Sequence, residues 1–162
     1  MFEKLDFMMR FWHLRARFGD PRGGLSASER IELMSLMRLM ATDHALPDPG
    51  PPPRTEEGFL VQMTSQHGFV AGELRLVCAG GVVVACHTPM PVGQSTLVRV
   101  ADEDSGTEYT LPCLVEWGFV GNPSAMALRV DGVPAQRRVA LQESGVWPTP
   151  MGWSETRAAS IK

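Results

Sequence analysis

The sequence predicts a mainly β protein in which two helices precede six short strands that form a barrel or a sandwich. Three observations support this fold class. Apolar residues recur at spacings of three and four over residues 2–18 and again from about residue 27. Prolines then crowd residues 47–53, where neither a helix nor a central strand can form. From residue 58 the apolar period becomes that of strands, and glycine and proline mark the turns.

Composition places the chain among globular proteins and excludes some partners. The 162 residues suit one domain with an extension, and 44% of them are hydrophobic against 20% charged. The formal net charge of −3 provides no general attraction to nucleic acid or to an anionic membrane. We therefore expect no nucleic-acid partner.

The first helix is expected over residues 2–18, where Phe7, Phe11 and Trp12 belong to a set of apolar residues at helical spacing. Charged residues interrupt this segment, so no uncharged run approaches the roughly 20 residues that span a bilayer. The segment also lacks the basic start, continuous apolar centre and small-residue cleavage site of a secretory signal. We expect no membrane span and a cytoplasmic protein.

A second helix is expected from Ser26 to about Asp43. Ser26 and Glu29 have the spacing of a capping box, in which each side chain binds the other residue's backbone N–H. The apolar arc of this helix is wider than one shallow contact needs. Either the two helices pack on each other and on the barrel, or they form an interface for self-association or for a protein partner. The candidate contact residues for the second interpretation are Phe11, Trp12, Met34, Met37 and Met40, with Trp147 and Trp153 in the C-terminal tail.

The chain divides into four segments: a helical extension at residues 1–44, a proline-rich linker at 45–57, the β region at 58–143 and a tail at 144–162. A short helix is expected near residues 134–143. The strands are predicted near residues 59–64, 69–78, 81–87, 95–101, 108–118 and 125–130. The linker allows the helices either to dock on the β region or to project from it.

Five short motifs follow one another in the β region. They are Leu76-Val-Cys78-Ala-Gly-Gly81, Pro89-Met-Pro-Val-Gly93, Thr96-Leu-Val-Arg-Val100, Cys113-Leu-Val-Glu-Trp117 and Ala127-Leu-Arg-Val130. In this order they resemble the PilZ domain, the six-stranded antiparallel β-barrel of bacterial cyclic di-GMP signalling, over residues 54–133. The resemblance implies a PilZ-like barrel and a role in behaviour such as motility, polarity or pilus regulation.

The polar residues with which typical PilZ domains hold cyclic di-GMP are missing here. Those domains carry an R-x-x-x-R segment before the first strand and a D-x-S-x-x-G motif, which supply guanidinium, carboxylate and hydroxyl groups to the ligand. Arg54 stands where the first arginine would be, but Gly58 follows four residues on. Leu76 and Cys78 occupy the aspartate and serine positions, and only Gly81 remains. Each lost charge-assisted hydrogen bond costs about 1.5–3 kcal/mol, so the usual binding of cyclic di-GMP is not expected.

An alternative function is a cyclic di-GMP receptor in which Arg54 and the divergent Arg22, Arg137 and Arg138 contact the phosphates. Catalysis is not expected, because the histidines lie apart from any plausible nucleophile and the sequence contains no phosphate-binding loop. The cysteines lack metal-ligand spacing, so neither a metal nor another cofactor is expected. The sequence favours a non-catalytic bacterial signalling or adaptor protein that acts through protein–protein interaction.

Overall fold

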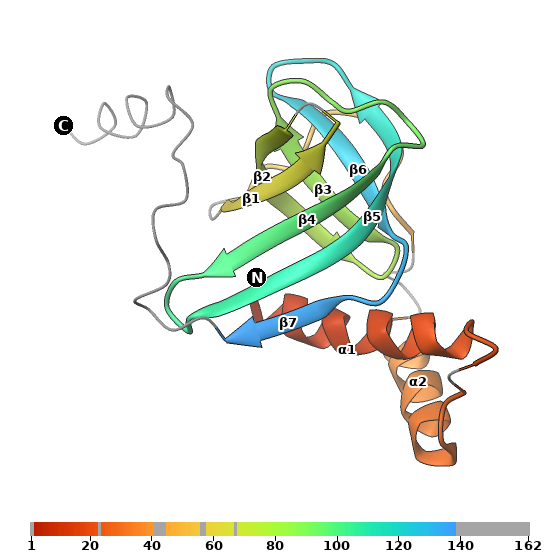
Figure 1. Cartoon of the computed structure of the whole chain (residues 1–162). Coiled ribbons are helices and arrows are strands. Elements are labelled where there is room, and N and C mark those ends of the chain that lie inside the picture. Colours follow the sequence, from red (N-terminus) through yellow and green to blue (C-terminus); the bar gives the residue numbers. More distant parts are fainter. Residues whose placement is uncertain (1, 23, 41–44, 56–57, 67, 139–162) are drawn as a thin grey trace.

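The computed structural model describes residues 2–22, 24–40, 45–55, 58–66 and 68–138 (Figure 1). Two helices come first in the chain, α1 (Phe2–Phe18) and α2 (Ala27–Leu39). The strands that follow are β1 (Phe59–Ser65), β2 (Gly68–Cys78), β3 (Gly81–Cys86), β4 (Ser95–Asp102), β5 (Thr107–Phe119), β6 (Ser124–Val130) and β7 (Ala135–Arg138).

Six of these strands close a barrel in the order β1-β2-β3-β6-β5-β4, and β4 returns to pair with β1. All the pairings are antiparallel. The closing pair of strands sets Met63 opposite Val98 and Val61 opposite Val100, and all four side chains are buried in the core. The predicted fold class, a six-stranded antiparallel barrel after two helices, is confirmed.

Two β-bulges determine which side chains face the barrel interior. One lies between Leu74 and Leu76 in β2, and the other lies between Val115 and Trp117 in β5. Leu74 and Val115 belong to the main core, whereas Leu76 and Trp117, two residues further on, pack in a separate outer cluster. Because an extra residue reverses the alternation of side chains along a strand, each bulge turns outward a side chain that would otherwise point inward.

Helix α1 lies across the lower end of the barrel in Figure 1 and completes its core. Trp12 donates its indole N–H to the Ala79 carbonyl, with 2.9 Å between Nε1 and the oxygen. Arg15 donates to the same oxygen at 3.1 Å and to the Val130 carbonyl at 3.2 Å. The side chains of α1 that join the barrel interior in one core are Leu5, Met8, Met9, Phe11, Trp12 and Leu14. Of the two arrangements that the linker allowed, α1 therefore adopts the docked one.

The prediction of a short helix near residues 134–143 is wrong for residues 135–138, which form the strand β7. β7 pairs with β5 over Thr107–Thr110. The shorter β6 pairs with β5 only from Cys113 onward, so the backbone edge of β5 before that point is open to another strand. Pairing of this edge satisfies backbone groups that a helix would leave without partners. Residues 139–143 lie outside the described part of the chain.

Glu108 ties β7 to the barrel. Its carboxylate accepts hydrogen bonds from Arg99 of β4 at 2.8 Å and from Arg137 of β7 at 3.2 Å. Burial raises the pKa of Glu108, but the hydrogen bonds from the two arginines outweigh it and hold this pKa below its ordinary value. The carboxylate therefore stays charged, and one buried acid links three strands.

The other element predictions agree with the structure to within a few residues. The first helix has the predicted bounds, and the second begins directly after Ser26 but ends at Leu39 rather than near Asp43. Residues 41–44 lie outside the described part. The linker residues 45–55 form neither helix nor strand, as expected. Neither described helix has the length and hydropathy that crossing a membrane would require.

Substitution Gly81→Ala should destabilise the barrel by about 3 kcal/mol. A Cβ at Gly81 would lie 2.0 Å from the Leu128 carbonyl oxygen, a backbone atom of the paired strand that cannot move aside. Chemical denaturation measures the change. The matched control is Gly24→Ala, where a Cβ meets nothing within 4 Å and the expected change is about 0.5 kcal/mol or less. Equal effects of the two substitutions would contradict the prediction.

Candidate functional site

Three of the candidate ligand-binding positions, Leu76, Cys78 and Gly81, lie at or beside the turn between β2 and β3. Leu76 is half-buried and packs in the outer cluster, Cys78 is fully buried, and Gly81 begins β3. Arg54 is exposed in the linker and forms no hydrogen bond or ion pair within the described residues. At these positions the barrel therefore offers a ligand neither a carboxylate nor an accessible hydroxyl.

A segment of the linker, Leu46–Pro49, covers the face of the barrel that carries Leu76, and we call it the strap. Leu46 packs against the outer cluster, whose central members Val83, Ala125 and Ala127 are fully buried. Trp117 donates its indole N–H to the Pro47 carbonyl, with 2.8 Å between Nε1 and the oxygen. The strap thus shields from water the apolar side chains that β3 and β6 direct outward.

A hollow of about 320 Å³ lies between the strap and the barrel. Its charged lining residues are Asp48, Glu116 and Arg129, so two carboxylates face one guanidinium. Arg129 is already engaged, because its Nε lies 3.2 Å from Glu116 and its Nη1 lies 3.9 Å from Asp131. A negatively charged lining repels phosphate, so the hollow does not suit a dinucleotide.

A second hollow, of about 640 Å³, lies between the β1–β2 turn and the loop before β4. Its lining residues carry no charge: Thr64, Ser65, Gln66, Pro91, Val92, Gly93, Gln94 and Ser95. Neutral polar groups at a rim can bind water or a neutral ligand, but they supply no strong attraction to an ion.

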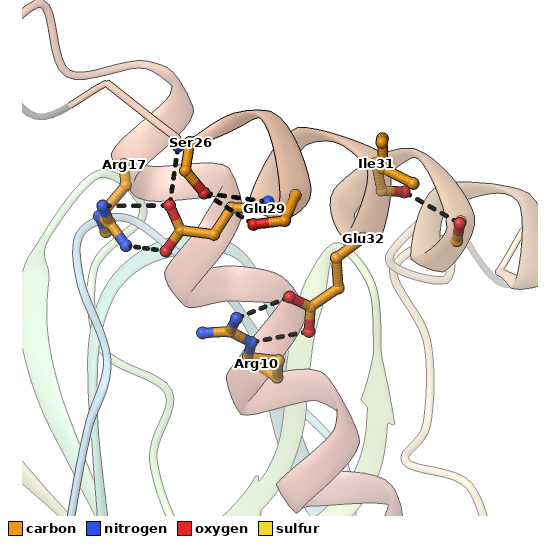
Figure 2. Close-up of polar contacts among 8 residues, drawn as sticks. Arg10, Arg17, Ser26, Glu29, Ile31 and Glu32 are labelled. Atoms are coloured by element: carbon orange, nitrogen blue, oxygen red, sulfur yellow. Dashed lines mark hydrogen bonds and ion pairs between the residues drawn. The ribbon is translucent and has the colours of Figure 1, made fainter.

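Two ion pairs fasten α2 to α1, and a capping box closes the start of α2 (Figure 2). Arg10 of α1 donates to both carboxylate oxygens of Glu32 at 2.8 and 2.6 Å, and Arg17 pairs with Glu29. The predicted capping box is confirmed, because the Ser26 backbone N–H donates to Glu29 at 2.9 Å and the Glu29 N–H donates to Ser26 Oγ at 3.2 Å. Both acidic side chains of α2 are therefore directed toward α1.

The candidate partner-binding residues on the helices fall into two groups. Phe11, Trp12 and Met40 are buried in the core, so for these three residues the interpretation that the helices pack on the barrel holds. Met34 and Met37 are 57% and 50% exposed on α2, so a partner can reach them. The interface interpretation stays a prediction for Met34 and Met37.

The sequence did not single out two residues of these surfaces, Ile31 and Leu46. Ile31 is 67% exposed and lies three residues before Met34, a helical spacing that was available in the sequence. The residues around Leu46 in the sequence do not indicate its contacts, because the outer cluster that it covers forms only in the folded barrel. Trp147 and Trp153 lie outside the described residues.

Within the described residues, no group of three or more His, Cys, Asp or Glu side chains could hold a metal ion. Two of the thiols there, Cys86 and Cys113, are poor nucleophiles. Burial raises the pKa of Cys86 to about 11, and burial followed by the charge of Asp131 raises that of Cys113 even further. Both thiols stay protonated at neutral pH, and the thiolate is the reactive form.

No protein-family model matches the chain, and no curated protein is similar to it in sequence. The fold and the site define a small closed β-barrel that carries a docked helical pair and a strap across one face. Any assignment finer than this class is a proposal.

Substitution Leu46→Asp should release the strap, because it places a charge against the apolar outer cluster. Once the strap leaves, the Trp117 indole N–H loses its Pro47 acceptor, so its hydrogen exchange measured by NMR should accelerate. The Trp12 indole, bonded inside the core, is the internal reference and should not change. Ala45→Asp, at the exposed neighbouring position, is the control. Unchanged exchange at Trp117 in Leu46→Asp would refute this role of Leu46.

The Glu29 contacts should make the helical pair sensitive to acid. The Ser26 backbone N–H, followed by the Arg17 guanidinium, lowers the pKa of Glu29 from the ordinary 4.5 to about 2. A folded-state pKa below the unfolded one means that the contribution to stability is complete above about pH 4.5 and is lost as the pH falls toward 2. The difference in free energy of unfolding between the unsubstituted chain and Glu29→Gln should shrink over this range. A difference that does not vary with pH would disprove the assignment.

Proposed function

We propose that this chain is a non-catalytic bacterial signalling protein of the PilZ type. It acts as an adaptor through protein–protein contacts and does not bind cyclic di-GMP in the usual manner. Its place in the cytoplasm and in motility, polarity or pilus regulation is implied by the PilZ resemblance of the motifs between Leu76 and Val130.

The observation that supports this proposal is that the face carrying Leu76, a position that the resemblance assigns to ligand binding, is covered by the chain itself. The chain's own strap lies on it, with Leu46 on the outer cluster and Pro47 bonded to Trp117. The ligand would have to displace these contacts before it gained any of its own. The apolar Leu76 and the buried Cys78 would then provide neither a carboxylate nor a hydroxyl in return.

Charge supports the same conclusion. Cyclic di-GMP carries two phosphates, and PilZ-type binding relies on guanidinium groups that are free to reach them. Arg129, the arginine of the hollow, is paired with Glu116, and Asp48 adds a second negative group. Of the substitute arginines, Arg137 is bonded to Glu108 on β5. None of the candidates Arg22, Arg54, Arg137 and Arg138 lines the hollow.

Calorimetric titration of the full chain with cyclic di-GMP tests the proposal. We expect no binding heat with the ligand at about 100 μM, because a complex of micromolar affinity needs about −8 kcal/mol and the groups that would supply it are absent or engaged. Micromolar binding that disappears in Arg54→Ala would instead establish the alternative, a receptor with divergent arginines. Binding that disappears in Arg129→Ala would place the ligand in the hollow and would equally overturn the proposal.

A further inference from the structure

Helix α2 turns one face to α1 and leaves an adjoining face exposed. In Figure 1 it extends from α1 on the side away from the barrel. Leu33 and Leu36 are buried on the inner face, beside the two ion pairs with α1. An exposed face of the helix begins beside Leu33 and runs round to the far side. It comprises Arg30, Ile31, Met34, Met37 and Arg38, which we call the α2 outer face.

The apolar part of the α2 outer face is centred on Met34. Ile31 precedes Met34 by three residues and Met37 follows it by three, so the three side chains adjoin on the helix surface. Each of them is at least half exposed: 67% for Ile31, 57% for Met34 and 50% for Met37. Flexible thioethers beside a branched side chain are typical of surfaces that adapt to an apolar partner.

The charges on the α2 outer face are all positive. Arg30 and Arg38 lie four residues before and after Met34, about 12 Å apart along the helix axis. Within the described residues neither guanidinium has an ion-pair partner; Arg30 donates only to the Leu25 carbonyl. The two acids of α2 itself, Glu29 and Glu32, are bonded to α1. A chain with a net charge of −3 therefore presents a local surface of the opposite sign.

We propose that the α2 outer face is a docking site for an acidic amphipathic helix of a partner protein. This inference rests on the proposed adaptor function and gives it a surface and a chemistry of partner. The partner places apolar side chains at helical spacing over Ile31, Met34 and Met37. Carboxylates about two turns apart on the partner then reach Arg30 and Arg38 and fix its register.

A second copy of this chain fits the α2 outer face poorly. An antiparallel pair of α2 helices centred on Met34 would set Arg30 of one copy against Arg38 of the other. A parallel pair would set each arginine against its own counterpart. Both arrangements bring like charges together at the edge of an apolar contact, where water no longer screens them well.

A membrane surface also fits poorly. Basic segments that bind anionic lipid commonly carry 4–8 Lys or Arg residues, each contributing about 1 kcal/mol. The α2 outer face has only Arg30 and Arg38, and the negative charge of the whole chain opposes approach to an anionic surface. A partner helix needs only two well-placed carboxylates.

The test uses the full chain and a labelled synthetic peptide of about 15 residues, long enough to form a helix. The peptide has leucines at helical spacing and glutamates on both flanks; a second peptide carries lysines in place of the glutamates. Fluorescence anisotropy should detect binding of the acidic peptide and not of the basic one. Met34→Glu should weaken this binding roughly tenfold or more, since it removes the central anchor.

Two further variants make the result specific. The double variant Arg30→Glu/Arg38→Glu should lose the acidic peptide and bind the basic one, which a purely apolar surface would not do. Leu39→Glu is the matched control, because Leu39 is 75% exposed on α2 but five residues from Met34 and off the outer face. It should leave the affinity unchanged within about twofold. Thermal unfolding confirms that each variant is folded.

Several results would overturn the inference. One is an acidic peptide that does not bind, or that binds equally to Met34→Glu and Leu39→Glu. Another is a parent chain that does not bind the peptide but self-associates in a sedimentation experiment, with the self-association lost in Met34→Glu. The same holds if the parent chain binds phosphatidylserine vesicles instead of the peptide and Met34→Glu abolishes that binding. These failures leave the calorimetric result with cyclic di-GMP untouched, so the docking site and the proposed function can fail separately.

Discussion

The two β-bulges are the constraint on which the character of the barrel surface depends. Without them, Leu76 and Trp117 would continue the alternation of Leu74 and Val115 and point inward. With them, both side chains join the outward residues of β3 and β6 in an apolar patch that water should not reach. The strap covers this patch. The Pro47 carbonyl oxygen of the strap accepts a hydrogen bond from the indole N–H of Trp117, which is the polar group of the patch.

The same arrangement connects fold to function. A face covered by the chain's own strap and bordered by Glu116 and Asp48 is a stable surface, but it is a poor site for phosphate. In the proposed function the barrel therefore serves as a scaffold. The docked α1 supports this role, because Trp12 and Arg15 share the Ala79 carbonyl as acceptor and anchor the helix to the turn between β2 and β3. Helix α2 is then held on a rigid base.

Distribution of charge sets the two faces of α2 apart. Arg10 and Arg17 of α1 draw Glu32 and Glu29 to the inner face, and Glu29 also caps the helix at its N-terminal end. The arginines of α2 itself are left outward around Met34. One set of ion pairs thus fastens the helix and, by consuming its negative charges, determines the sign of the surface that remains.

Local rules in the sequence determined the elements themselves. Helical spacing defined α1, the Ser26–Glu29 pair defined the start of α2, and turn residues separated the six barrel strands, because each signal acts within a few residues. Only the tertiary structure decided which apolar residues are exposed: it buried Trp12 and Met40, exposed Ile31 and Met34, and placed Leu46 over the outer cluster. It also made residues 135–138 a strand, because an open edge of β5 lay beside them. Burial and edge pairing depend on neighbours far away in the chain, and no local pattern encodes them.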